Sequence, residues 1–384
     1  MTTYSEADLV RIAKRYNNPR RNYLIVNPLQ AKHIPVSPEK ALTMMEDLGS
    51  LLVQKSPGTK LLIGFAETAT ALGAAAANCF GNGCIYIHTT RENIEKNTLW
   101  ACFSEEHSHA VAQKICVEKF DEWLEHTTRV IFLDDELTTG KTLLNIIGEL
   151  KKMFPKLQKK QITAASLINR LSAENLARLA ENGVSCASLS YIVGSDYNHK
   201  AEQYTVCAPQ RPVLSATTPL CSLTTLPEAM ELGGDPRLGV EIGVYNEKCI
   251  ACARKLALDL TRHLHPSSKV LVLGTEECMY PAIILGRELE KAGMAQVKCH
   301  ATTRSPIGLS RESGYPIPQG FELASLYEAE RVTYIYNLDR YETVIIVSDA
   351  VNPQNTGLRD LQAALSLSGC DQIFYVKISQ SLYN

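Results

Sequence analysis

The sequence VIFLDDELTTGKT, which runs from Val130 to Thr142, carries the clearest structural signal in the chain. Its first four residues are apolar, which predicts a buried strand of a parallel sheet, because such strands are covered on both faces and do not alternate. Two carboxylates, Asp134 and Asp135, follow, then a turn rich in hydroxyl groups, and LLNIIGEL at 143–150 has helical spacing. A strand, a turn and a helix start present free N–H groups and the positive end of a helix dipole to a phosphate. The two acids suit a sugar diol or a Mg²⁺ ion beside that phosphate, so the sequence predicts a phosphosugar site.

Two other interpretations of this sequence are weaker. Its last three residues, Gly140-Lys141-Thr142, also read as the end of a nucleotide-binding P-loop. That motif needs a glycine five positions before its second glycine, and residue 135 is an aspartate, whose charge would repel the phosphates. The turn could also be an ordinary helix start with two hydroxyl caps. Helix caps do not require a pair of acids at the end of a buried strand, so the phosphosugar interpretation is favoured.

At these residues the chain resembles the type I phosphoribosyltransferases. Their signature for 5-phosphoribosyl-1-pyrophosphate (PRPP) is four apolar residues, two acids and a loop rich in Thr and Gly, as found here. The resemblance implies a Mg²⁺-dependent enzyme in which Asp134 and Asp135 lie near the ribose 2- and 3-hydroxyls and bind the metal. Members specific for 6-oxopurines open the phosphate loop with an Asp, where this chain has Thr138, so the resemblance does not point to hypoxanthine or guanine. The residues expected to hold the 5-phosphate are Thr138, Thr139, Gly140, Lys141 and Thr142.

Another strand end supplies candidates for the pyrophosphate group. Ala66, Glu67 and Thr68 lie where this fold class binds pyrophosphate through backbone N–H groups. Related enzymes often carry a basic residue there, so Glu67 is expected to act through a second Mg²⁺ or to recognise another group. The alternative is a carboxylate favoured only by the helix dipole. Lys32 and His33 follow the first expected strand and are candidates to enter the site from below, unless they are ordinary basic residues of the surface.

The segment RENIEKNTLWACFSEEHSHA, residues 91–110, lies where the mobile catalytic loop of this fold is expected. Arg91 and Lys96 are candidates to neutralise the leaving pyrophosphate. A metal cluster of the histidines and glutamates, or a solvated charged loop, are alternatives. The candidates for acid–base work are Glu105, Glu106, His107 and His109.

The bulk composition limits the class of protein. A chain of 384 residues suggests about two domains of ~150–200 residues. The net charge of −2, without a basic tail or stripe, argues against nucleic acid as the main partner. No apolar run approaches the ~20 residues of a membrane span, and the N-terminus lacks a signal-peptide pattern. The 12 cysteines are scattered, which favours buried thiols of a reducing cytoplasm, and the CxxC at 249–252 has no second pair at zinc spacing.

The alternation of apolar strands and helical segments predicts an α/β fold with mainly parallel sheets flanked by helices. A helix is expected at 6–16, and the polar, Pro- and Thr-rich segment 194–238 is expected to be a connection with some irregular structure. The expected strands are at 23–27, 60–66, 84–88, 130–133, 162–167 and 185–193.

The pattern of the first half is repeated in the second half. Glu67 stands opposite Glu277, and Asp135 stands opposite Asp349, at spacings that agree within a loop length. Three such matches in the same order predict two copies of one fold. The matched segments are 61–75 with 270–286, 89–91 with 302–304, and 130–142 with 344–356.

The second copy has lost part of the chemistry of the first. Ser348 replaces the first acid of the pair, and Pro353 lacks an N–H group that a phosphate would use. The second copy is therefore expected to be degenerate and not to bind PRPP in the same way.

The second copy also contains HATTRSPIGLSRESGYPIPQGFEL at 300–323, with the motif Thr303-Arg304-Ser305-Pro306. It resembles the TRSP domain found behind a phosphoribosyltransferase domain in tellurium-resistance-associated stress operons. The resemblance covers nearly the whole chain, since NPLQAKHIP at 27–35 and SEEHSHA at 104–110 also look like that family's first domain. It implies a role in making a nucleoside-like metabolite.

The expected organisation is a PRPP-binding domain at 1–195, a linker at 196–240 and a TRSP domain at 241–384. The leading hypothesis is a cytoplasmic enzyme that transfers phosphoribose from PRPP to a base or base-like small molecule and releases pyrophosphate. The alternative is a non-catalytic sensor of PRPP or a nucleotide that acts through the TRSP domain. The sequence does not identify the acceptor, and because this fold often pairs, a homodimer is a further expectation.

Overall fold

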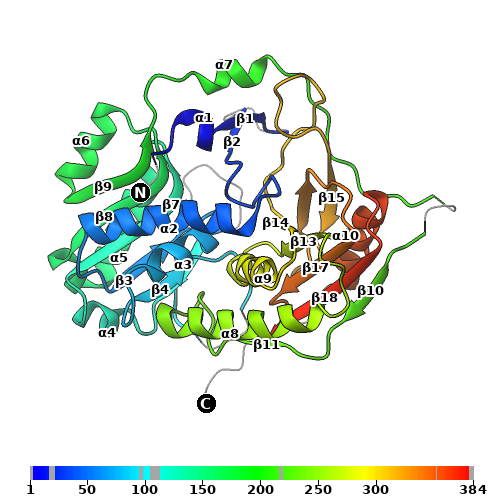
Figure 1. Ribbon diagram of the computed structural model, residues 1–384. Helices are drawn as coiled ribbons and strands as arrows, with labels where there is room; N and C mark the ends of the chain where they lie inside the picture. The colour runs from blue at the N-terminus through cyan, green and yellow to red at the C-terminus, as the bar shows by residue number, and fades with distance from the viewer. Residues whose placement is uncertain are drawn as a thin grey trace.

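The computed structural model describes residues 3–16, 22–94, 98–103, 113–215, 219–351 and 353–379. Within these residues the strands form two large, mainly parallel sheets with helices around them, which confirms the predicted α/β class (Figure 1). Most strands of the first sheet are coloured blue to green, and most strands of the second are coloured yellow to red (Figure 1).

The first sheet has the strand order β12-β4-β3-β7-β8-β9, and all neighbours are parallel except β12, which is antiparallel to β4. Leu62 and Ile131 belong to the apolar core that contains α2 and α3, whereas Ile63 and Phe132 belong to the core with α4 and α5. Helices thus cover both faces, which explains why the segments 61–63 of β3 and 130–133 of β7 are continuously apolar. The strands are β3 (Leu61–Gly64), β4 (Ile85–His88), β7 (Arg129–Leu137), β8 (Gln161–Asn169), β9 (Val184–Tyr191) and β12 (Val240–Glu241). The helices are α2 (Pro38–Lys55), α3 (Thr70–Asn78), α4 (Phe120–Glu125), α5 (Lys141–Met153), α6 (Ala173–Glu181) and the 3₁₀ turn η1 (Pro155–Lys159).

The second sheet has the order β10-β18-β17-β13-β14, with parallel neighbours throughout, and β11 also pairs with β18. Its strands are β10 (Ser222–Thr225), β11 (Met230–Glu231), β13 (Lys269–Gly274), β14 (Gln296–Ala301), β17 (Thr343–Ser348) and β18 (Gln372–Ser379). Its helices are α8 (Ile242–Leu260), α9 (Tyr280–Lys291) and α10 (Asn355–Leu367).

The two copies predicted from the sequence have the same topology. The strand order β4-β3-β7-β8 of the first sheet recurs as β14-β13-β17-β18 in the second. An antiparallel hairpin stands between the second and third strands of each copy along the chain: β5 (Trp100–Phe103) with β6 (Gln113–Cys116), and β15 (Gly320–Ala324) with β16 (Val332–Tyr336). Single hydrogen bonds recur as well, since Ala66 N donates to Thr89 Oγ1 at 2.9 Å and Glu276 N donates to Thr302 Oγ1 at 3.0 Å.

The copies pack against each other as the subunits of a symmetric dimer do. Helix α2 contacts α9, and its counterpart α8 contacts α3, the counterpart of α9 (Figure 1). The segment before α2 follows the same rule, because Val36 pairs with Cys299 of β14 while β12, just before α8, pairs with β4. Reciprocal contacts of this kind define a two-fold, isologous interface. The second copy therefore occupies the place of a partner subunit.

The N-terminus corrects one expectation. The predicted helix at 6–16 is wrong beyond its first turn, because α1 is Glu6–Leu9 and β1 is Arg11–Lys14. Strand β1 pairs with β2 (Tyr23–Val26), and Ala13 is fully buried in a cluster that includes residues of the second copy. Tertiary packing here overrides a local helical preference.

The segment 196–240 does more than connect the copies. It forms α7 (Tyr197–Glu202) beside the β1–β2 hairpin, supplies β10 and β11 to the second sheet and ends in β12 of the first.

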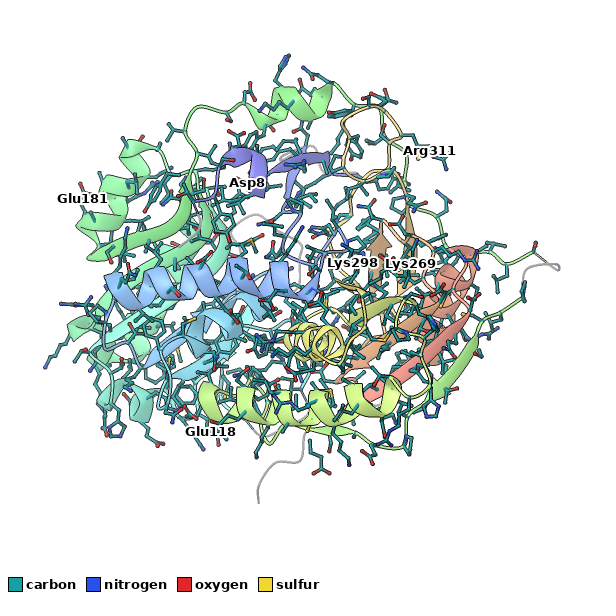
Figure 2. The ribbon with its side chains drawn as sticks, in the orientation of Figure 1. Asp8, Glu118, Glu181, Lys269, Lys298 and Arg311 are labelled. Carbon is teal, nitrogen blue, oxygen red and sulfur yellow. The ribbon has the colours of Figure 1, made fainter. Side chains whose placement is uncertain are left out.

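Charged residues such as Glu118, Glu181 and Arg311 lie at the outer edge of the molecule (Figure 2). Among the helices of the described ranges, none is both long and apolar enough to cross a membrane.

Candidate functional site

The phosphate loop lies between β7 and α5. Strand β7 continues through both acids to Leu137, and α5 begins at Lys141, so the loop is Thr138-Thr139-Gly140. Gly140 has φ 68°, a left-handed conformation that glycine adopts at low cost. The N–H groups of Thr138, Thr139 and Gly140 donate to no acceptor in the described part of the chain. Together with the helix start, these N–H groups form a site suited to a phosphate.

The two predicted acids meet at the same edge. Asp134 Oδ1 accepts a hydrogen bond from Asp135 N at 2.9 Å, and Asp135 Oδ1 accepts one from Thr68 Oγ1 at 3.0 Å. Burial, and then the neighbouring carboxylate of Asp135, hold the pKa of Asp134 well above its ordinary value. A cation or a pair of hydroxyl donors placed here would relieve both effects.

The loop after β3, residues 65–69, lies beside the acids. Ala66 N donates to Thr89 Oγ1 at 2.9 Å, and the peptide bond between Ala66 and Glu67 is cis. Within the described residues, the N–H groups of Glu67 and Thr68 donate to no protein acceptor. Successive free N–H groups in a turn form a concave site for an anion, which fits the predicted pyrophosphate loop.

These elements line one cavity of about 640 Å³, a volume in the usual range for a small-molecule site. The β1–β2 hairpin contributes Arg15, Leu24 and Ile25 to its wall. The TRSP motif of the second copy contributes Arg304, Ser305 and Pro306, which were not among the predicted site residues. The predicted site residues that line the cavity are Ala66, Glu67, Thr68, Arg91, Asp134, Asp135, Thr138, Thr139, Gly140 and Thr142.

Glu67 is not positioned as a free carboxylate. Its side chain forms ion pairs with Lys32 Nζ and with Arg304 Nε, the latter at 2.7 Å, and is 8% exposed. Burial raises the pKa of Glu67, but the charges of Lys32 and Arg304 outweigh it and hold the pKa below its ordinary value. The carboxylate is therefore ionised, and its charge is already balanced by Lys32 and Arg304. This arrangement fits neither a ligand of a second Mg²⁺ nor an acid held only by the helix dipole.

The other predicted site residues are placed less directly. Lys32 is fully buried and also donates to Glu276 O at 3.1 Å and Thr302 O at 3.3 Å. His33 is buried with its ring 6.3 Å from that of Tyr336, and burial lowers its pKa to about 3. Neither residue lines the cavity, and Lys141 is exposed outside it. Lys96, Glu105, Glu106, His107 and His109 lie outside the described residues.

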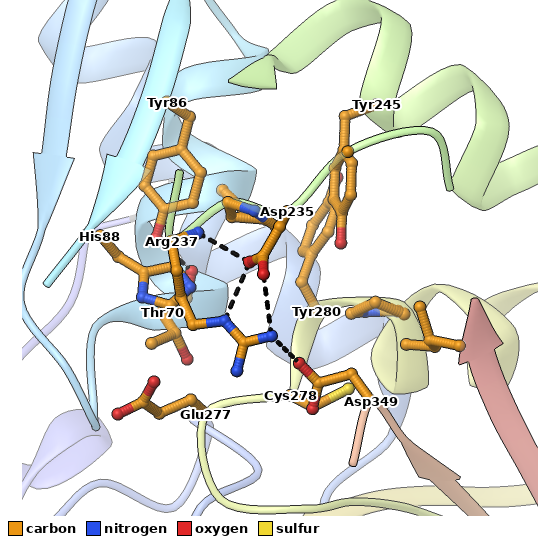
Figure 3. A pocket seen from close by; sticks show the side chains of 15 residues that line it. Thr70, Tyr86, His88, Asp235, Arg237, Tyr245, Glu277, Cys278, Tyr280 and Asp349 are labelled. Carbon is orange, nitrogen blue, oxygen red and sulfur yellow. Dashed lines mark hydrogen bonds and ion pairs between the residues drawn. The ribbon is translucent and has the colours of Figure 1, made fainter. Parts of the chain in front are cut away.

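The corresponding edge of the second copy is filled by side chains (Figure 3). Asp349 accepts a hydrogen bond from Arg237 Nη2 at 2.7 Å and one from Tyr327 Oη at 2.5 Å. Arg237 also binds both carboxylate oxygens of Asp235, at 2.9 and 3.0 Å (Figure 3). The cavity left beside them is about 40 Å³, which does not admit a sugar phosphate.

Comparison with protein families follows this division of the chain. Residues 9–195 match the family described as phosphoribosyl transferase, and residues 236–365 match the TRSP domain that lies C-terminal to it. The chain thus combines a phosphoribosyl transferase domain with a TRSP domain. The first copy is thus the phosphoribosyl transferase domain, and the second is the TRSP domain. Comparison with curated proteins found no match.

Solved structures of several phosphoribosyltransferases are similar to about half of the chain. Adenine phosphoribosyltransferase from Giardia lamblia, complexed with 9-deazaadenine, is 16% identical with a TM-score of 0.35, over 50% of this chain and 98% of that one. Orotate phosphoribosyltransferase from Aeropyrum pernix is 19% identical with a TM-score of 0.30, over 49% of this chain and 89% of that one. Adenine phosphoribosyltransferase from Trypanosoma brucei is 13% identical with a TM-score of 0.34, over 47% of this chain and 76% of that one.

The residues present fit the predicted Mg²⁺. No cluster of three or more His, Cys, Asp or Glu that could hold a metal occurs in the described ranges. Mg²⁺ usually keeps several waters and is bound by one or two carboxylates together with substrate oxygens. Asp134 and Asp135 can provide the carboxylates. When bound, such an ion neutralises charge on phosphate oxygens.

Proposed function

We propose that this chain is a Mg²⁺-dependent phosphoribosyltransferase that uses PRPP to ribosylate a base or base-like acceptor, with release of pyrophosphate. The observation that carries the proposal is the convergence of three groups on one cavity. The phosphate loop at 138–140, the acids Asp134 and Asp135, and the loop at 65–69 all line it. Each group matches one part of PRPP: the 5-phosphate, the ribose diol and the pyrophosphate.

The proposed roles follow from the donors and charges of each group. The free N–H groups of the phosphate loop and the start of α5 bind the 5-phosphate. The carboxylates of Asp134 and Asp135 accept from the ribose hydroxyls and hold the metal. The N–H groups of Glu67 and Thr68, with the nearby guanidinium of Arg91, stabilise the charge that develops on the departing pyrophosphate. The acceptor then lies against the remaining wall of the cavity, which is formed by the β1–β2 hairpin and by Ser305 and Pro306.

The proposal includes one working site in each chain. The site of the TRSP domain is closed by Arg237 and Tyr327, and its acid pair is reduced to Asp349. The proposed domain division is 1–195, 196–240 and 241–384. The free, scattered cysteines of the described residues support a reducing cytoplasm as the compartment. A homodimer and a link to tellurium resistance remain predictions.

The test is pyrophosphate release from PRPP and Mg²⁺ in the presence of a broad panel of bases and other nucleophiles. We expect release with at least one acceptor, and none from Asp134→Asn combined with Asp135→Asn. If PRPP binds but no acceptor releases pyrophosphate, the alternative of a PRPP sensor that acts through the TRSP domain replaces the enzyme.

A further inference from the structure

The cavity-facing loop that carries Glu67 is held by the TRSP domain. Arg304, the arginine of the TRSP motif, donates to Glu67 Oε2 from Nε at 2.7 Å and to Glu67 Oε1 from its backbone N at 3.3 Å. The Arg304 side chain is 14% exposed, so the pair is largely shielded from water. A buried ion pair of this geometry is expensive to break, because the carboxylate left behind is desolvated.

A second loop of the phosphoribosyl transferase domain is held at the same place. Glu277 of the TRSP domain accepts hydrogen bonds from Thr90 Oγ1 at 2.6 Å and from Arg91 N at 3.1 Å. These residues form the base of the segment expected to be the catalytic loop. Glu277 Oε1 also accepts from Arg304 Nη2 at 2.7 Å. One guanidinium therefore bridges the anchor of the pyrophosphate loop and the anchor of the second loop.

A further ion pair, between Arg331 and Glu92, lies beside the guanidinium of Arg304. Glu92 accepts from Arg331 Nη1 at 2.5 Å and from Arg304 Nη1 at 3.4 Å. Arg331 also binds Glu276, at 3.0 Å. All three nitrogens of the Arg304 guanidinium thus face carboxylates, two of them from the other domain. The planar fork of arginine can make these contacts at once, and the single ammonium of lysine cannot.

Domain cohesion alone does not explain the position of this cluster. The same two domains are also joined by an ion pair between Arg287 and Glu46 at 3.3 Å, which links α9 to α2 and does not line the cavity. The Arg304 cluster, by contrast, holds Glu67 and Arg91, which both line the cavity that contains the proposed pyrophosphate site. Displacing such a loop by about 1 Å can reduce turnover about 100-fold.

We propose that Arg304 is a positioning residue for pyrophosphate release: through Glu67 and Glu277, the TRSP domain fixes both loops that border the departing pyrophosphate. The TRSP domain then serves as a built-in partner subunit that completes the site. This inference rests on the proposed function for its kinetic part and on the loop contacts alone for its structural part.

The experiment compares Arg304→Ala and Arg304→Lys with Arg287→Ala in the full chain. Arg287→Ala is the matched control, because it also removes an inter-domain ion pair but touches neither loop. We expect kcat for pyrophosphate release to fall about 10- to 100-fold in Arg304→Ala and less in Arg304→Lys, with KM for PRPP changed by a smaller factor. Arg287→Ala should retain the kcat of the wild type. Equal loss of melting temperature and of kcat in both alanine variants would show a merely cohesive role and overturn the proposal.

A second measurement separates this inference from the proposed function. Hydrogen exchange of the unliganded protein should speed up about tenfold in segments 64–70 and 88–94 of Arg304→Ala, and not in Arg287→Ala. If exchange is faster in Arg304→Ala but the wild-type chain has no transferase activity, the anchoring by Arg304 is supported and only the proposed enzymatic function is overturned. Unchanged exchange in these segments, also in the milder Arg304→Lys variant, would overturn the anchoring itself.

Discussion

Replacing Gly140 with alanine adds one methyl group to the phosphate loop and tests whether the loop geometry binds PRPP. Gly140 has φ 68°, and a left-handed conformation costs an alanine about 1–2 kcal/mol. The new Cβ would also lie 3.1 Å from Leu179 Cδ1, a tight contact that the end of a leucine side chain can relieve. If the loop leaves its left-handed turn, the phosphate loses about one charge-assisted hydrogen bond, worth about 1.5–3 kcal/mol.

The expected result for Gly140→Ala is an affinity for PRPP that is weaker by about 10- to 100-fold, measured by titration calorimetry with Mg²⁺ present. Gly183→Ala is the control, because Gly183 has φ 72° with nothing within 4 Å of its added Cβ and does not line the cavity. Both variants should lose about 1–2 kcal/mol of stability. Affinity for PRPP that is the same in Gly140→Ala and Gly183→Ala would refute the role of this loop.

Two further predictions concern charged groups at the interface between the domains. Burial, and then the neighbouring Glu277 and Glu276, raise the pKa of Glu92 from 4.5 to about 7. Between these pH values the folded chain binds a proton that the unfolded chain releases. The stability of the fold therefore falls as the pH rises from about 4.5 to about 7. Glu92→Gln should reduce this loss of stability by on the order of 1–3 kcal/mol. The melting temperature of the variant should then depend less on pH between 5 and 8. An unchanged pH profile would show that the pKa of Glu92 is not raised. Arg237→Ala should lower the free energy of unfolding by about 3–5 kcal/mol, since it leaves the buried Asp235 and the largely buried Asp349 without their cation. The affinity for PRPP should be unchanged in the folded fraction.

The parts of the fold that the sequence predicts are those encoded in short, contiguous patterns. The strand, acids, turn and helix at 130–150 are such a pattern, and the internal repeat follows from comparing three of them. The expected helix at 6–16 failed because β1 is determined by its pairing with β2 and by packing on the TRSP domain. Contacts with residues this distant in sequence leave no periodic signal.

The Arg304 cluster could not be predicted from the sequence for the same reason. Glu67 and Arg304 are 237 positions apart, and no spacing rule relates them. Two signals were present, an acid where related enzymes often carry a base, and a TTR sequence in each copy. Reciprocal packing of the two copies would have brought Glu67 of one toward Arg304 of the other, since Glu277 and Arg91 are their counterparts and also meet.

The most direct test of the central claim is the stoichiometry of PRPP binding, measured by titration calorimetry of the full chain with Mg²⁺. The account predicts one PRPP per chain, and no binding after Asp134→Asn is combined with Asp135→Asn. Two PRPP per chain, or one PRPP that survives the double substitution, would show that the cavity of the phosphoribosyl transferase domain is not the site.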